Sequence, residues 1–202
     1  MSRRIFTLSC LLLMIMAGFA SAQNSLSALS ARLSGGTAVF EYAFTTSGGS
    51  TPFEGSGKAA VTGPCYRIEG NGLDIRCDGK VRYTADPAAG EMVIEASEGE
   101  ALDFLSNPAL LLSDLGNSFS VENYVRNSDG IESYTLSAVS EPSIESLVLV
   151  LSKGLPSGAE LFMKDGSKLD FKISGFKFTD ETFMWSFSSS ELSKYSTVTD
   201  LR

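Results

Sequence analysis

Acidic side chains are the residues of this 202-residue chain that could do acid–base chemistry. Asp74 with Asp78, or Glu98 with Glu100, could form the two-carboxylate site of a glycosidase, in which one group protonates the leaving oxygen. The chain has 24 acidic residues and no histidine, so some acidic pairs are inevitable and imidazole-dependent catalytic and metal sites are excluded. Solvated surface charge accounts better for these pairs, and we expect a protein that is not an enzyme.

Other chemical motifs also have structural explanations. The pairs Asp78-Gly79 and Asp165-Gly166 are typical of turns, and neither belongs to a calcium-loop pattern. The cysteines have no metal-type spacing and there is no phosphate-binding glycine loop, so we expect no metal and no cofactor. The formal net charge of −8 argues against nucleic acid and against an anionic membrane surface as partners.

The first 22 residues have the pattern of a secretory signal. Two arginines precede the apolar run Ile5–Phe19, which ends in the small residues Ala20-Ser21-Ala22. The run is shorter than a membrane-spanning helix and is interrupted by polar residues. We expect cleavage after Ala22, export of a soluble protein, and one domain over residues 23–202.

The elements that would position any site are mostly strands. In residues 57–95, short β-type runs alternate with turn pairs such as Gly63-Pro64, Asn71-Gly72 and Asp86-Pro87, which is typical of an antiparallel meander. Further strands are expected over 37–46, 53–62, 119–125, 133–139, 146–151 and 182–188, with a hairpin over 159–174. The apolar residues of that hairpin all have odd numbers, which requires an odd loop with Gly166 at a positive-φ bulge position.

The Asn71-Gly72 turn decides where the two cysteines after the signal lie. A two-residue turn pairs Ile68 with Ile75 and places Cys65 and Cys77 on opposite faces. A turn centred on Asn71 would instead place them opposite each other and allow a disulfide. The apolar pairing favours the first register; the disulfide between Cys65 and Cys77 stays open as the alternative.

Two short helices are predicted. The first follows the cap Asn24-Ser25, ends at Gly35-Gly36, and presents Leu26, Leu29 and Leu33 on one face. The second begins at Asn107-Pro108, ends at Gly116, and carries Leu110, Leu111, Leu112 and Leu115. The second is too short to be stable alone, so it must dock on apolar surface.

Aromatic residues at alternating strand positions indicate what these helices cover. The candidate apolar sheet face consists of Phe40, Tyr42, Phe44, Tyr83, Phe171, Ile173 and Trp185. These side chains would either fill the interior of the protein or line an incompletely filled pocket for acyl chains.

The central block resembles the LolA family of periplasmic outer-membrane lipoprotein carriers. The similarity rests on Gly63-Pro64 before Tyr66, Cys77-Asp78-Gly79-Lys80, Tyr83 and Asp86-Pro87, and again on 159–188. It implies a mainly β fold: an unclosed antiparallel barrel, or strongly curved single sheet, with a short N-terminal helix and a leucine-rich lid. It further implies acyl-chain binding on the candidate face, acylated lipoproteins as cargo, and delivery from an inner-membrane ABC transporter to an outer-membrane acceptor that it does not identify. We expect a monomer.

One position departs from the family. Gly63 stands where family members have an arginine that helps to hold the lid closed. By this resemblance lid closure would rest on leucine contacts, and the cargo could differ. The alternative function is a module on the same fold that senses a lipid or lipoprotein without delivering it.

Overall fold

The computed structural model describes residues 25–48, 52–97, 115, 119–139 and 143–202. The predicted signal, residues 1–22, and three of the four lid leucines, Leu110, Leu111 and Leu112, lie outside the described residues. So do the acidic pair Glu98 and Glu100. The predictions made for these residues therefore stay predictions.

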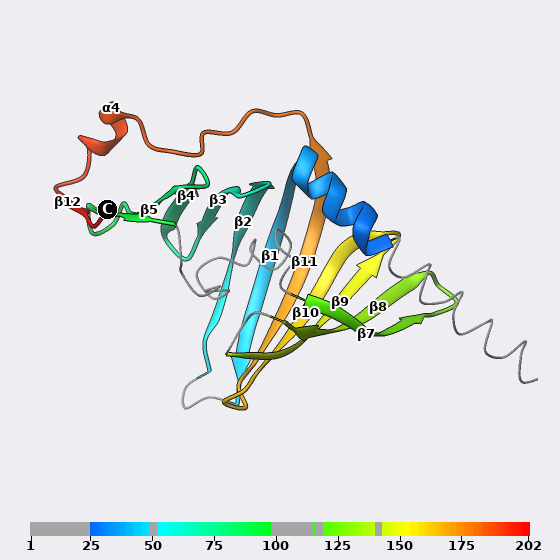
Figure 1. Cartoon of the computed structure of the whole chain (residues 1–202). Helices are drawn as coiled ribbons and strands as arrows, with labels where there is room; N and C mark the ends of the chain where they lie inside the picture. The colour runs from blue at the N-terminus through cyan, green and yellow to red at the C-terminus, as the bar shows by residue number, and fades with distance from the viewer. Residues whose placement is uncertain (1–24, 49–51, 98–114, 116–118, 140–142) are drawn as a thin grey trace, which may run out of the picture.

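Twelve strands form one sheet, in the order β12-β6-β5-β4-β3-β2-β1-β11-β10-β9-β8-β7 (Figure 1). The two ends of this order, β12 and β7, do not pair with each other, so the sheet is curved but not closed, as predicted. All neighbours are antiparallel except β12, which runs parallel to β6. The strands are β1 Thr37–Ser47, β2 Glu54–Thr62, β3 Cys65–Gly70, β4 Leu73–Cys77, β5 Val81–Asp86, β6 Glu91–Ala96, β7 Phe119–Arg126, β8 Ile131–Ala138, β9 Ile144–Ser152, β10 Leu155–Met163, β11 Lys168–Thr179 and β12 Thr197–Asp200.

The N-terminal helix, residues 25–35, crosses one face of the sheet, which we call the inner face. Leu29 and Leu33 are buried there, and the Gly63 N–H donates a hydrogen bond of 3.1 Å to the carbonyl of Leu33. At the other end of the helix, the Ser25 side chain lies beside the Tyr134 hydroxyl on β8. In Figure 1 the helix, in blue, accordingly runs from the region of β1 and β11 toward β8.

The predicted hairpin registers are confirmed. Ile68 pairs with Ile75, and Asn71 and Gly72 both have positive φ, 52° and 83°, as a two-residue turn with right-handed strand twist requires. Tyr66 therefore pairs with Cys77, and Cys65 and Cys77 lie on opposite faces as free thiols. In the second hairpin Leu161 pairs with Leu169, and Gly166 has a φ of 85°, so the odd loop is also confirmed.

Gly63 occupies the first position of the two-residue loop that joins β2 to β3. Thr62 pairs with Cys65 across this loop, and Gly63 has a φ of 51°. A side chain is strained at this conformation, which gives a local reason why this chain has glycine here. The link to the helix is made by the Gly63 backbone instead.

The predicted strand 182–188 is wrong. β11 ends at Thr179, and the chain then continues without regular structure to the short helix α4, Ser189–Leu192, before it reaches β12. Figure 1 shows this segment, in orange and red, leaving the end of β11 for the far end of the sheet. We call residues 180–202 the strap. The aromatic residues Phe183, Trp185 and Phe187 alternate like those of a strand, but this part of the strap forms no strand, and only β12 at its end joins the sheet.

Candidate functional site

An apolar surface on the inner face is the candidate site. Phe40, Tyr42 and Phe44 alternate along β1 and are all buried, because residues two apart in a strand share a face. On the neighbouring strand β11, Phe171 pairs with Phe44 and Ile173 pairs with Tyr42. The structure thus brings together five of the seven residues predicted for this face.

Tyr83 and Trp185 are the two exceptions, and their assignment to this face is wrong. Tyr83 pairs with Arg76, and successive pairings across the meander place both on the opposite, outer face. There the Tyr83 ring contacts Phe187 of the strap, with 5.9 Å between ring centroids. Trp185 also belongs to the strap and stacks on Phe183 at 5.5 Å.

Glycines on β2 and β3 make room for the aromatic rings of β1. A Cβ on Gly55 would lie 2.6 Å from the Phe44 ring, and one on Gly57 or Gly70 would lie 2.8 Å from the Tyr42 hydroxyl. These rings therefore lie directly over the backbone of the neighbouring strands. The sequence of β2 is rich in Gly and Ala. These small residues are needed on the inner face because larger side chains would collide with the rings of β1.

The apolar surface continues over β8, β9 and β10 with the buried residues Tyr134, Leu136, Leu147, Leu149, Ala159 and Leu161. One charged group interrupts it. Glu132 is only 7% exposed and accepts hydrogen bonds from the Tyr134 and Tyr124 hydroxyls, at 2.9 and 3.3 Å. Burial and then the bond to Glu132 raise the pKa of Tyr134 well above its ordinary value. Sequence analysis missed Glu132, although it lies in phase with Tyr134 and Leu136.

The N-terminal helix covers part of this surface with its leucines. Leu29 and Leu33 belong to the same buried cluster as the aromatic residues of β1, and Leu26 packs against it. The Arg32 guanidinium lies 3.9 Å from the centroid of the Phe178 ring. Leu115, the one described residue of the predicted lid, is buried in this cluster. The rest of that helix lies outside the described residues, so its docking on apolar surface stays a prediction.

The outer face carries a second, smaller core beneath the strap. Ala85, Met92, Ile94 and Phe187 form it, and Tyr83 packs against it. Arg76 lies at its border, 5% exposed, with its guanidinium 3.8 Å from the Phe187 ring centroid and 3.1 Å from a Glu191 carboxylate oxygen.

Glu191 is held by the turn that begins α4. The Ser188 backbone N–H and hydroxyl donate to this carboxylate at 2.8 and 2.7 Å. These bonds, and then Arg76, lower the pKa of Glu191 to about 2. The strap is therefore anchored on the outer face by a charged group that stays ionised down to low pH.

No cluster of possible metal ligands occurs in the described part of the chain. Among the same residues, no helix has both the length and the apolar character needed to cross a membrane. The inner face is an apolar surface with one buried carboxylate, whose hydrogen bonds come from neighbouring tyrosines.

Comparison with known proteins gives matches in structure only. No family model matches the sequence, and no curated protein matches it. Among solved structures, a LolA superfamily protein from Nitrosomonas europaea is 12% identical, with a TM-score of 0.44, over 80% of this chain and 94% of that one. A DUF1329 family protein from Desulfovibrio piger is 14% identical, with a TM-score of 0.46, over 84% and 98% of the two chains. A putative outer membrane lipoprotein-sorting protein domain from Vibrio parahaemolyticus is 10% identical, with a TM-score of 0.42, over 89% and 97%.

These matches include the class of protein that residues 57–95 resemble. At such identities and TM-scores the likeness concerns the arrangement of strands, and it does not specify a cargo.

Proposed function

We propose that this protein binds the acyl chains of lipoproteins on its inner face, as a periplasmic carrier between the inner and outer membranes. The observation that carries the proposal is the continuous apolar inner face, crossed by a helix that contacts it mainly through leucines. Such a face can exchange the leucine contacts for contacts with a fatty chain.

The free energies gained and lost in this exchange are of similar size. Burying ten methylene groups of an acyl chain gains roughly 8 kcal/mol, whereas re-exposing two leucines costs about 3–6 kcal/mol. The described polar links of the helix to the sheet include the bond from Gly63 to Leu33, the Ser25 contact with Tyr134 and the Arg32 contact with the Phe178 ring. Each contributes about 1 kcal/mol, so an acyl chain can compete with the closed arrangement.

The remaining parts of the proposal follow the sequence resemblance. They are export by residues 1–22, an ABC transporter as donor, an outer-membrane acceptor, a monomeric state, and a lid made by residues 110–115. The absence of histidine from the chain agrees with binding in place of catalysis.

Extraction of labelled lipoprotein from inner-membrane vesicles tests the proposal. Ile173 is the residue to change, because it lies on the inner face and is only partly buried, so that Ile173→Asp puts a charge there without emptying the core. The matched control is Lys172→Asp, on the exposed outer side of the same strand. We expect Ile173→Asp to reduce extraction at least tenfold and Lys172→Asp to leave it unchanged, with both variants keeping the wild-type circular dichroism spectrum.

Equal extraction by the two variants would contradict a role for the inner face. A second step, the transfer of extracted lipoprotein to outer-membrane vesicles, separates a carrier from a sensor. A protein that extracts cargo but never releases it to acceptor membranes is a binding module, and delivery would then be ruled out.

A further inference from the structure

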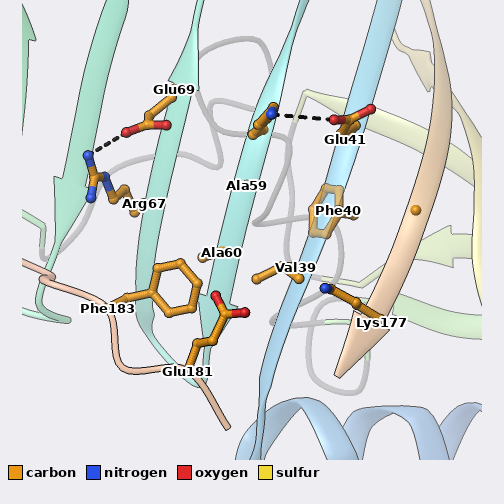
Figure 2. Close-up of a pocket in the computed structure, with 12 residues that line it drawn as sticks. Val39, Phe40, Glu41, Ala59, Ala60, Arg67, Glu69, Lys177, Glu181 and Phe183 are labelled. Carbon is orange, nitrogen blue, oxygen red and sulfur yellow. Dashed lines mark hydrogen bonds and ion pairs between the residues drawn. The ribbon is translucent and has the colours of Figure 1, made fainter. Parts of the chain in front are cut away.

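A pocket of about 410 Å³ opens on the outer face, on the opposite side of the sheet from the acyl-binding surface. It lies over β1, β2 and β3, next to the end of β11 and under the beginning of the strap. Figure 2 shows Val39 and Ala60 on its floor and Phe183 of the strap at its side. Its volume falls in the range of small-molecule sites, and its floor is apolar.

An irregularity in the sheet contributes to this pocket. The register of β1 and β11 shifts between Val39 and Glu41, where Gly175 and Phe176 together oppose Phe40. Gly175 has a φ of 62°, as in a bulge with glycine in the left-handed conformation. Beyond the bulge, Lys177 at the end of β11 and Glu181 just after it both line the pocket.

Charges surround the apolar floor in balanced numbers. Lys58 and Glu41 form an exposed ion pair at 3.6 Å, and Arg67 pairs with Glu69. The buried Arg67 Nε atom has no hydrogen-bond partner among the described residues.

Lys177 and Glu181 are different, because no ion pair or side-chain hydrogen bond joins either charged group to another described residue. In Figure 2 their charged ends face each other across Val39. A cation and an anion without partners, separated by an apolar floor, are complementary to a ligand that carries both charges and an apolar body.

We propose that this pocket binds a small zwitterion with an apolar side chain, either a free hydrophobic amino acid or a hydrophobic dipeptide. Glu181 receives the ligand's ammonium group and Lys177 its carboxylate. The apolar side chain lies on Val39 and Ala60 against the Phe183 ring. This site does not depend on the acyl-binding role, since it uses the other face of the sheet.

Calorimetric titration of the full protein with leucine and with leucyl-leucine tests the proposal. Comparing the two ligands shows whether the pocket prefers a free amino acid or a dipeptide. N-acetyl-leucine lacks the ammonium group and leucinamide lacks the carboxylate. We expect saturable binding of at least one zwitterion and about tenfold weaker binding of each blocked analogue, since each loses a charge-assisted interaction.

Two variants assign the charges to residues. Lys177→Met and Glu181→Gln should each weaken binding about tenfold. The controls Lys172→Met and Glu145→Gln remove equally exposed charges outside the pocket and should leave it unchanged. Lipoprotein extraction should be unaffected in all four variants, so that failure of this proposal and failure of the carrier proposal are distinguishable.

Three results would each overturn the inference. The first is that neither zwitterion binds saturably up to concentrations on the order of 10 mM. The second is that the blocked analogues bind as tightly as the zwitterions. The third is that the control variants lose as much affinity as the Lys177 and Glu181 variants. Nuclear magnetic resonance shifts confined to the inner face would also contradict it, because the ligand would then occupy the other site.

Discussion

Arg76 should decide whether the strap stays on the outer face. It is 5% exposed and donates to the Ser186 carbonyl at 3.2 Å, in addition to its ion pair with Glu191 and its contact with the Phe187 ring. On the sheet side it is fixed by Asp74 at 2.8 Å. Arg76→Met keeps most of the aliphatic volume and removes every one of these polar links to the strap.

The expected loss can be estimated from the partners that remain. Removing one member of a buried ion pair typically costs about 3–5 kcal/mol, largely because the other charge is left buried. Here Asp74 keeps Arg67 at 3.2 Å and Glu191 keeps the Ser188 hydroxyl at 2.7 Å. The lower value, about 3 kcal/mol, therefore applies, and it raises the population of the undocked strap roughly a hundredfold.

Amide hydrogen exchange measures this population directly. The Leu201 N–H donates to the Ile94 carbonyl at 2.8 Å and the Ser196 N–H to the Gly90 carbonyl at 2.9 Å, so the exchange of both requires these bonds between strap and sheet to break. We expect their exchange to accelerate about a hundredfold in Arg76→Met. The Met163 N–H, in the hairpin far from the strap, should be unaffected.

Arg67→Met is the matched control, because Arg67 also pairs with Asp74 but makes no ion pair with any described strap residue. It should leave the exchange of Leu201 and Ser196 within about threefold of the wild-type rate. If Arg76→Met behaves like this control, the strap is held by its apolar contacts and the argument from Arg76 is refuted.

Three further predictions concern acidity, packing and thiols. Because the pKa of Glu191 is lowered to about 2 from an ordinary 4.5, its contribution to docking is complete above about pH 4.5 and is lost as the pH falls toward 2; Glu191→Gln should remove this acid dependence of strap exchange. Gly57→Ala should lower the free energy of unfolding by about 1–3 kcal/mol in urea titrations, since the new Cβ meets backbone and the Tyr42 hydroxyl, whereas Gly35→Ala, with open space around it, should be neutral or stabilising. Adding a reductant to the oxidised, purified protein should not shift its melting temperature, because its two described cysteines are free; a shift of several degrees would reveal a disulfide.

Local signals in the sequence were sufficient for the hairpins. The pair Asn71-Gly72 and the residue Gly166 require particular backbone conformations, and these conformations fix the register of the strands beside them. The N-terminal helix was likewise predictable from its leucine spacing and its terminal glycines. In each case the determinants lie within a few residues of the element.

Local sequence signals could not predict the course of the strap or the face of the sheet on which Tyr83 lies. Alternation of Phe183, Trp185 and Phe187 is what a strand requires, but a strand also needs a free neighbour. The preceding strand β11 is already paired on both sides, by β1 and β10. The face of Tyr83 relative to Phe40 depends on four successive strand pairings, so that a single-residue difference in any of them would reverse it.

The position of β12 has a consequence for self-association. Without it, the outermost strand on that flank would be β6, a six-residue strand that carries the apolar side chains of Met92 and Ile94. Such a strand is a template for intermolecular β-addition. The last strand presents to solvent only four residues, all exposed, and an aspartate–arginine pair at its end. On this flank the protein thereby offers other copies of itself only a short, charged strand, with few free backbone groups to which an intermolecular strand could add.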